Sequence, residues 1–406
     1  MQYRDIAFLC GYFSVKNGNP NDIFASQGGF WTRVEYQGEE LAWARDFYYP
    51  EFAEFMMCEV SAYSHSCDSE IPLKLRDGRE HKVHLDELCA YVFPFGIVII
   101  TVKVSQQAER IQDILDALFM MRGICSADKS LMPEYVSSVL DPLSVLNHAA
   151  GNPLDYRYLM ECGNKFRIFH MILCGDRPAD ETAFDALLYG GGTLLEYKDD
   201  DPKGFSRQYY ENIMSGSRVS VFNNWKALSL LDTFTIVAHG VQKEMLNLWC
   251  SEYFGKLYLY ALYRKFFLFR IYGDFRSGAK EISKVRKDLT RFENDHTFPK
   301  VSYNFLPETL MDAMEKGLDV QTETVKVAEM IERENARREA ETGDKMNLFL
   351  GVITCLTLFS AIWDFACLMD GAFEFSTNIG TATGIRACAM LLISVICISA
   401  FFVRRK

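Results

Sequence analysis

Two long apolar runs near the C-terminal end constrain this chain more than any other feature. Residues 346–369 read MNLFLGVITCLTLFSAIWDFACLM, and residues 385–403 read IRACAMLLISVICISAFFV. Each run is about 20 residues long, the length that an α-helix needs to cross roughly 30 Å of hydrocarbon. Buried helices of soluble proteins are usually shorter and carry more charge. The sequence therefore predicts a hairpin of two transmembrane helices within residues 345–406.

The charges that flank these runs predict their orientation. Lys345 precedes the first run, and the basic residues 404–406 follow the second. The connecting residues 370–384 contain Asp370 and Glu374 but no lysine or arginine. Because cationic residues stay on the cytoplasmic side of a membrane, both ends of the hairpin are predicted to be cytoplasmic and the loop to lie outside. The larger N-terminal part is then cytosolic.

Composition and motifs exclude several classes of function. The net charge is −11, so no basic surface is expected for a nucleic-acid partner. The 12 cysteines occur singly, without the Cys/His spacing of a zinc site, and no metal site is evident. The sequence has no nucleophile elbow, no metal-binding HExxH and no P-loop. We therefore expect no enzyme and assign no catalytic residue.

The first 240 residues combine strand and helix patterns, which predicts an α+β domain built on a mixed sheet. Asp77-Gly78 separates two strand-like segments and indicates a hairpin. Residues 106–121 and 182–188 have helical spacing, and Gly190 to Gly192 are expected to end the second helix in a turn. The remaining strand predictions, from β-branched and aromatic runs, are residues 6–15, 30–36, 96–104, 166–173, 219–222 and 233–237.

Residues 241–344 are predicted to be helical. The segment 244–272 is rich in aromatics but is interrupted by lysine and arginine, so we expect a helix packed against the sheet rather than a third span. Stacking of its aromatics on a nucleobase is the alternative. A second helix is expected over 278–294. Residues 308–344 are predicted to form one long amphipathic stalk helix that continues into the first span, and its narrow apolar stripe favours self-association.

This order of segments resembles the CorA-like family of divalent-cation transporters and channels. Residues Met346 to Thr354, MNLFLGVIT, are similar to the family's run M-N-x-x-(M/L)-K-V-(L/I)-T at the membrane entry. In the same register the family's Gly-Met-Asn signature falls on Gly371, Ala372 and Phe373, so this chain is a divergent relative that lacks the signature. Divergent CorA-like proteins of this kind also resemble the membrane effectors associated with type III CRISPR systems.

The resemblance implies a homopentameric ion channel in the bacterial inner membrane, with several spans and cytoplasmic termini. It also implies gating from the cytosolic domain, as an antiviral effector opened by a nucleotide second messenger such as an S-adenosylmethionine–AMP conjugate. The alternative is a divergent uptake transporter for magnesium or another divalent cation. A second alternative is a membrane-anchored receptor or enzyme without a pore. The sequence points to no ligand pocket.

Helical geometry places the polar and small residues of the first run on one face, at 100° per residue. That face is predicted to line a pore, because polar groups facing lipid are costly. Its members are Asn347, Leu350, Thr354, Thr357, Ala361, Asp364 and Leu368. The predicted pore mouth comprises Asp370, Gly371, Phe373 and Glu374.

Three residue types on this face suggest separate roles. Leu350 would form a hydrophobic gate, Asn347 and the threonine hydroxyls would contact the ion or its water, and Asp364 would form a carboxylate ring that favours cations. Alternatively, the threonines bond to their own helix and Asp364 pairs with Arg386 of the second span. The cytosolic carboxylates are expected either to bind regulatory divalent ions between subunits or to be solvated. They are Glu315, Asp319, Glu323, Glu329 and Glu332.

Overall fold

The structure is a computed structural model that describes residues 2–15, 18–25, 31–36, 38–122, 166–195, 206–278 and 281–372. Side chains are described as far as residue 364, with that of Ile23 excepted. The chain forms two compact units, Met1–Glu329 and Met330–Lys406. The second apolar run, 385–403, and the predicted mouth residues Phe373 and Glu374 lie outside the described residues.

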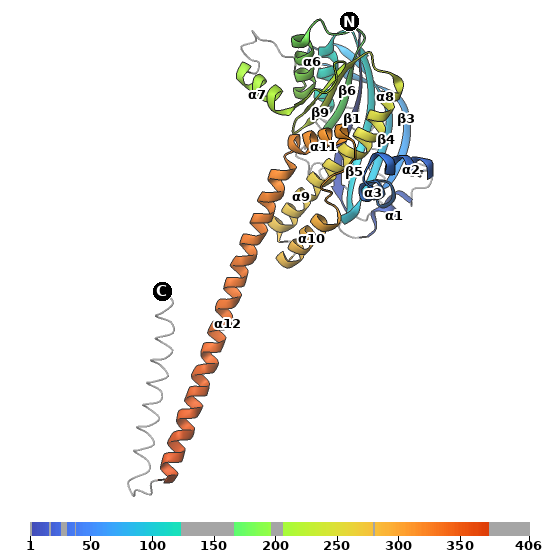
Figure 1. Cartoon of the computed structure of the whole chain (residues 1–406). Coiled ribbons are helices and arrows are strands. Elements are labelled where there is room, and N and C mark those ends of the chain that lie inside the picture. The colour runs from blue at the N-terminus through green and yellow to red at the C-terminus, as the bar shows by residue number, and fades with distance from the viewer. Residues whose placement is uncertain are drawn as a thin grey trace. The chain divides into compact units, whose positions relative to one another are not determined.

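A nine-stranded mixed sheet forms the centre of the first unit (Figure 1). Its strand order is β2-β3-β4-β5-β1-β6-β9-β8-β7. The strands are β1 (Tyr3–Ser14), β2 (Thr32–Val34), β3 (Ser61–Lys74), β4 (Glu80–Phe93), β5 (Ile97–Ala108), β6 (Arg167–Cys174), β7 (Arg218–Val219), β8 (Trp225–Ser229) and β9 (Thr233–His239). This mixed sheet, with its helices, confirms the predicted α+β fold class.

Helices of the first unit cover the sheet and connect its strands. They are α1 (Pro20–Ala25), α2 (Gly38–Phe47), α3 (Pro50–Glu54), α4 (Ile111–Arg122), α6 (Glu181–Thr193), α7 (Arg207–Ser217), α8 (Lys243–Leu248), α9 (Leu259–Ser277), α10 (Ile282–Asp295) and α11 (Phe305–Gly317). The described residues also form two π-helices, η1 (Phe55–Glu59) and η5 (Trp249–Tyr258), and the 3₁₀ turn η2 (Pro94–Gly96). Beyond them, α12 comprises Val320–Ala372.

Strand direction divides the sheet into two parts. Strands β3, β4, β5, β1 and β6 pair antiparallel, and Asp77-Gly78 forms the predicted turn between β3 and β4. The pair β6 and β9 is parallel, which requires a crossover rather than a hairpin. Helix α6 lies in this crossover and packs against β9 and β8. The carboxyl ends of β6 and β9 therefore lie at the same edge of the sheet.

Alternation along β1 gives the sheet two apolar faces. Leu9 and Phe13 point toward a core that includes Leu118 of α4. Phe8 and Tyr12 point the other way and stack on η5 and α9, with ring centroids 3.7 Å from Phe254 and 4.1 Å from Phe266. The aromatic segment is therefore a buried helix on the sheet, as predicted. Its π-helical first half was not predicted.

The prediction of a turn at Gly190 to Gly192 is wrong, because these glycines lie in the last turn of α6. A Cβ atom on Gly191 would lie 2.5 Å from Cγ2 of Thr235, and one on Gly192 would lie 2.5 Å from Cδ2 of Leu228. The glycines therefore let α6 lie directly on β9 and β8. Close packing between helix and sheet, rather than chain reversal, explains their presence.

The prediction of one unbroken helix over 308–344 is also wrong. Helix α11 ends at Gly317, and α12 begins at Val320. Between them Asp319 has φ of 56°, a left-handed conformation that interrupts the helix.

The predicted strand over 219–222 is likewise reduced to the two residues of β7, and β8 was not predicted.

Of the helices that the structure describes, α12 is the one long and apolar enough to cross a membrane, over Val320–Asp364. It continues to Ala372, so Asp370 and Gly371 belong to its last turn and not to the predicted loop. The chain thus has an α+β domain followed by a long apolar helix that could span a bilayer.

The close packing of α6 predicts the effect of an added methyl group. The change Gly191→Ala should destabilise the fold by about 1–3 kcal/mol, because Thr235 is buried and its hydroxyl contacts His170. Gly216→Ala in α7 is the matched control, since its Cβ would meet nothing within 4 Å. It should stabilise the helix by up to about 1 kcal/mol. Thermal unfolding followed by circular dichroism measures both, and equal midpoints would contradict the packing argument.

Candidate functional site

The surface of α12 between Met346 and Trp363 is apolar and uncovered. Phe349 is 62% exposed and Leu356 is 63% exposed, and several neighbouring large side chains are similarly bare. A contiguous apolar surface of this kind marks contact with a membrane or with another protein. This helix is therefore the first candidate functional element.

Six of the predicted pore residues have exposed side chains on this part of α12: Asn347, Leu350, Thr354, Thr357, Ala361 and Asp364. Leu368, Asp370 and Gly371 follow on the same helix, where only the backbone is described. The threonine hydroxyls donate to helix carbonyls, Thr354 to Leu350 at 2.8 Å and Thr357 to Thr354 at 2.9 Å. Their oxygens keep lone pairs that can accept hydrogen bonds from water or contact a cation.

Within the described residues, the five carboxylates predicted to bind regulatory ions do not gather into a metal site. Nowhere in that part of the chain do three His, Cys, Asp or Glu side chains converge as metal ligands would. Glu315 instead pairs with Arg264, and Glu323 pairs with Lys265 at 2.6 Å. Two of the five predicted regulatory carboxylates are therefore neutralised by α9.

These two ion pairs hold the junction between α11 and α12. Lys265 also donates to the carbonyl of Leu318 at 2.7 Å, just before the left-handed Asp319. Burial lowers the pKa of Lys265, and the neighbouring Glu323 opposes that shift. A Cβ atom on Gly317 would lie 2.8 Å from the carbonyl carbon of Ser229, so the end of α11 presses against the end of β8. The junction is thus fixed to both α9 and the sheet.

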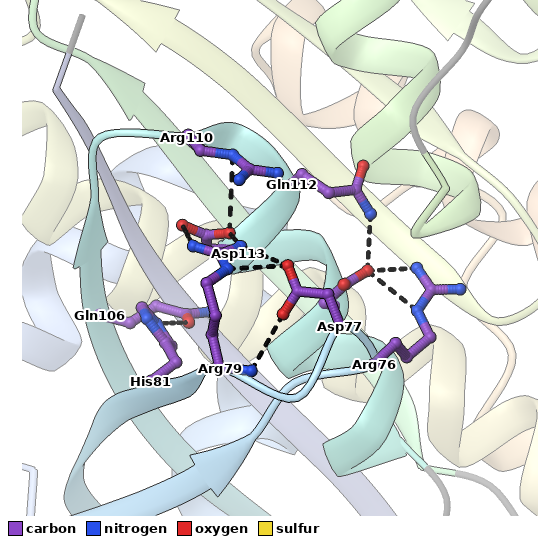
Figure 2. Close-up of polar contacts among 9 residues, drawn as sticks. Arg76, Asp77, Arg79, His81, Gln106, Arg110, Gln112 and Asp113 are labelled. Carbon is purple, nitrogen blue, oxygen red and sulfur yellow. Dashed lines mark hydrogen bonds and ion pairs between the residues drawn. The ribbon is translucent and has the colours of Figure 1, made fainter.

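A cluster of arginines and aspartates joins the β3–β4 turn to α4 (Figure 2). Arg79 pairs with Asp77 at 2.7 Å and also with Asp113, and Arg76 donates from Nε to Asp116 at 2.9 Å. Hydrogen bonding to Arg79 lowers the pKa of Asp77. Because these arginines already face carboxylates, the cluster acts as a clasp between turn and helix and not as an anion site.

A row of hydrogen-bonded polar side chains begins near this clasp and crosses the sheet. His81 contacts Gln106 at 2.9 Å, and Gln106 donates to Asp5 at 3.1 Å. Asp5 in turn contacts Nδ1 of His170 at 3.0 Å, and Nε2 of His170 lies 2.7 Å from the Thr235 hydroxyl. Asp5 and His170 are fully buried, so this row of side chains holds neighbouring strands together and offers no catalytic surface.

A hollow of about 510 Å³ lies at the carboxyl end of β6, where the chain enters α6. Its lining consists of Arg177, Pro178, Ala179, Asp180, Glu181, Phe184 and Asn223. Asp180 caps α6 by accepting from the backbone N–H of Ala183 at 2.7 Å. Sequence reasoning missed this hollow, although a predicted strand followed closely by a helix was the available signal.

Next to the hollow, an ion-pair network joins α6 to β8. Lys226 of β8 is buried and donates to both Glu181 and Asp185, the latter at 2.8 Å. Its ammonium lies 4.9 Å from the centre of the Phe184 ring. Hydrogen bonding from Lys226 lowers the pKa of Glu181. The first turn of α6 is thereby tied to the start of β8.

Comparisons of the chain with protein families, with curated proteins and with solved structures find no match. The functional argument therefore depends on the residues themselves.

The clasp gives a prediction that a double-mutant cycle can measure. Arg76→Ala and Asp116→Ala should each destabilise the protein, and their coupling energy should be about 0.5–1 kcal/mol, because Arg76 is 36% exposed and partly screened. Arg207 and Glu211, an exposed pair within α7, supply the control cycle. A coupling no larger than that of the control pair would show that the clasp does not hold the turn.

Proposed function

We propose that this protein is a homo-oligomeric ion channel of the CorA-like type, gated by its α+β domain. The observation that carries the proposal is α12, with its uncovered apolar surface and its stripe of polar and small residues. The apolar side of the helix can contact lipid, whereas placing the side chains of Asn347 and Asp364 in hydrocarbon would cost free energy. Several copies arranged in a ring place the stripe around a shared, hydrated axis.

The stripe contains the parts that such a pore needs. A ring of Leu350 side chains forms a narrow apolar segment that stops ions when it dewets. Asp364 adds a ring of carboxylates that attracts cations, and the threonine oxygens can contact passing ions or their water. The proposed setting is the bacterial inner membrane, with the second apolar run as another span and the large domain in the cytoplasm.

Gating requires a physical connection between the domain and α12. The junction at Asp319 provides one, because Lys265 and Arg264 of α9 hold α11 and α12 on either side of it. A rearrangement of the sheet or of α9 reaches the first turn of α12 through these contacts. We infer that a nucleotide signal acts on the domain and that the chain serves as a defence effector.

Flux through the full chain in liposomes tests this proposal. Internal magnesium is titrated first, and nucleotide second messengers are then added in turn. Flux that appears only with a nucleotide supports the gated effector, and flux blocked by internal magnesium favours a divergent divalent-cation transporter. The absence of flux under every condition overturns the channel.

A membrane-anchored receptor is the second candidate. The donation of the Thr354 and Thr357 hydroxyls to their own helix favours it, because these side chains are then satisfied without a pore. In that case α12 is a tether, and the full chain conducts no ions while still responding to its ligand.

The carboxylate at Asp364 predicts the selectivity of the pore. Asp364→Asn should lower the preference for cations over anions by roughly tenfold, because a ring of negative charge is removed. Asp344→Asn is the control, since it removes a carboxylate of the same helix that lies off the stripe. Reversal potentials under a salt gradient measure the preference, and an unchanged potential in Asp364→Asn contradicts the assigned role.

The junction predicts a variant that separates gating from conduction. Lys265→Met keeps the length of the side chain but leaves the Leu318 carbonyl and Glu323 without their cation, at a cost of about 1–3 kcal/mol. Flux should then lose its dependence on the regulating ligand. Lys243→Met, at an exposed cation of α8, should behave as wild type. Normal regulation in Lys265→Met would exclude the junction as the coupling element.

A further inference from the structure

A histidine of β4, His84, lies between two aspartates. Its Nε2 atom is 2.9 Å from Oδ1 of Asp68 on β3, and its Nδ1 atom is 2.8 Å from Oδ1 of Asp86 on its own strand. The side chain of His84 is 39% exposed, so the site lies at the surface of the sheet. The imidazole ring thus connects two neighbouring strands through both of its nitrogen atoms.

Two irregularities in strand pairing place the aspartates beside this ring. The register of β3 on β4 shifts over residues 66–69, and Asp68 lies within that shift. The register of β4 on β5 shifts over residues 85–87, and Asp86 is the residue left unpaired there. Such bulges re-aim side chains that a regular ladder would point elsewhere. Both carboxylates therefore reach His84 because the two strands are irregular at the same level of the sheet.

The number of protons on the ring decides how many of these contacts can form. An ionised carboxylate only accepts hydrogen bonds, whereas a neutral imidazole carries one N–H and an imidazolium carries two. The contacts to Asp68 and Asp86 can therefore exist together only when His84 is protonated on both nitrogens. In agreement, hydrogen bonding to Asp86 and to Asp68 raises the pKa of His84 above the ordinary value of 6.5.

The two aspartates differ in how easily they can leave the ring. The side chain of Asp68 is 97% exposed, so water can replace the histidine as its partner. Asp86 is 26% exposed and also accepts a hydrogen bond from the Ser105 hydroxyl of β5 at 3.0 Å. When His84 loses a proton, the remaining N–H is therefore expected to stay on Asp86, and the contact to Asp68 is the one that breaks.

Other charged or titratable side chains lie on the elements around His84: Glu70 of β3, Lys82 and Glu87 of β4, Lys103 of β5 and Cys250 of η5. Glu70 and Lys82 pair with each other at 2.7 Å, which lowers the pKa of Glu70 and raises that of Lys82. Burial raises the pKa of the Cys250 thiol. These shifts move the three groups further from neutral pH, so they do not compete with the titration of His84.

We propose that His84 is a pH-dependent latch, which ties the irregular part of β3 to β4 when it is protonated and releases Asp68 when it is not. The histidine gains two anionic partners on folding, so the folded protein holds this proton more tightly than the unfolded chain does. The latch therefore stabilises the fold fully below the ordinary histidine pKa of about 6.5. Its contribution is lost as the pH rises through the higher pKa of the folded state.

The position of the latch determines what its release affects. Strand β3 lies between β4 and the short strand β2, which ends the sheet on that side. Release of Asp68 leaves the middle of β3 held to β4 by fewer contacts, so the sheet loosens near this edge. The inference concerns the α+β domain alone and is independent of whether α12 conducts ions.

Hydrogen exchange of the full chain in lipid nanodiscs, measured by mass spectrometry, tests the latch. Exchange of the backbone amides of residues 66–70 is followed from about pH 5.5 to about pH 8.5, on either side of the ordinary histidine pKa, and is corrected for the intrinsic pH dependence of exchange. Protection of these amides should fall by roughly two- to fivefold across the transition, because exposed ion pairs contribute modestly. Protection that stays constant over this range overturns the proposal.

Two variants should abolish the step in opposite ways. His84→Ala removes the latch, so protection of residues 66–70 should be low at every pH. Asp68→Asn replaces a carboxylate by an amide, which can donate to a neutral Nε2 and accept from a protonated one. Protection in Asp68→Asn should therefore stay high at every pH. Lys82→Met is the matched control, since it removes the neighbouring exposed pair with Glu70 and should keep the step.

The variants also define the results that would exclude the latch. A step that persists in His84→Ala assigns the pH dependence to another group and overturns the proposal. A step that persists in Asp68→Asn removes Asp68 from the latch, and a step lost in Lys82→Met assigns the effect to the pair of Lys82 and Glu70. Either of these outcomes overturns the proposal as well.

Discussion

The stacking of one aromatic helix on the central strand organises the described part of the first unit. Phe254 and Phe266 lie against Phe8 and Tyr12 of β1, the strand that lies between β5 and β6 in the sheet. This contact closes one face of the sheet and fixes η5 and α9 in register with it. Because α9 also carries Arg264 and Lys265, the same packing positions the cations that hold the start of α12. The packing of the core therefore also positions the junction.

The parallel pair β6 and β9 gives the domain an asymmetry that its antiparallel strands lack. The carboxyl ends of the pair lie at the hollow above Lys226, and the opposite ends lie near the junction at Gly317. Strand β8 spans the distance between them. The hollow and the junction are therefore linked by few contacts along one short strand.

The sequence predicted those features that depend on local pattern. The β-branched run of β5, the Asp77-Gly78 turn and the apolar surface of α12 each follow from neighbouring residues, and the structure contains them. The glycines of α6 were misread because their role depends on Thr235 and Leu228, more than 30 residues away along the chain. The break at Asp319 was missed for the same reason, since tertiary contacts from α9 hold a conformation that its own sequence does not favour.

The candidate site was harder to predict than the fold. The polar stripe of α12 could be found from helical spacing alone, whereas the hollow joins Arg177 and Phe184 to Asn223 from a distant loop. Similarly, Glu315 and Glu323 looked like free carboxylates in sequence, and only the fold reveals their partners on α9. Residues that converge through tertiary contacts leave little trace in one sequence.

The pairing of β1 has a consequence for the order of events during synthesis. Tyr3 pairs with Cys174, and β6 in turn needs β9, so the sheet cannot close until the chain beyond His239 has emerged from the ribosome. The apolar surface of α12 follows later still. The domain can thus complete its core before the hydrophobic helix appears, which shortens the time that an unfinished sheet and an exposed apolar helix coexist.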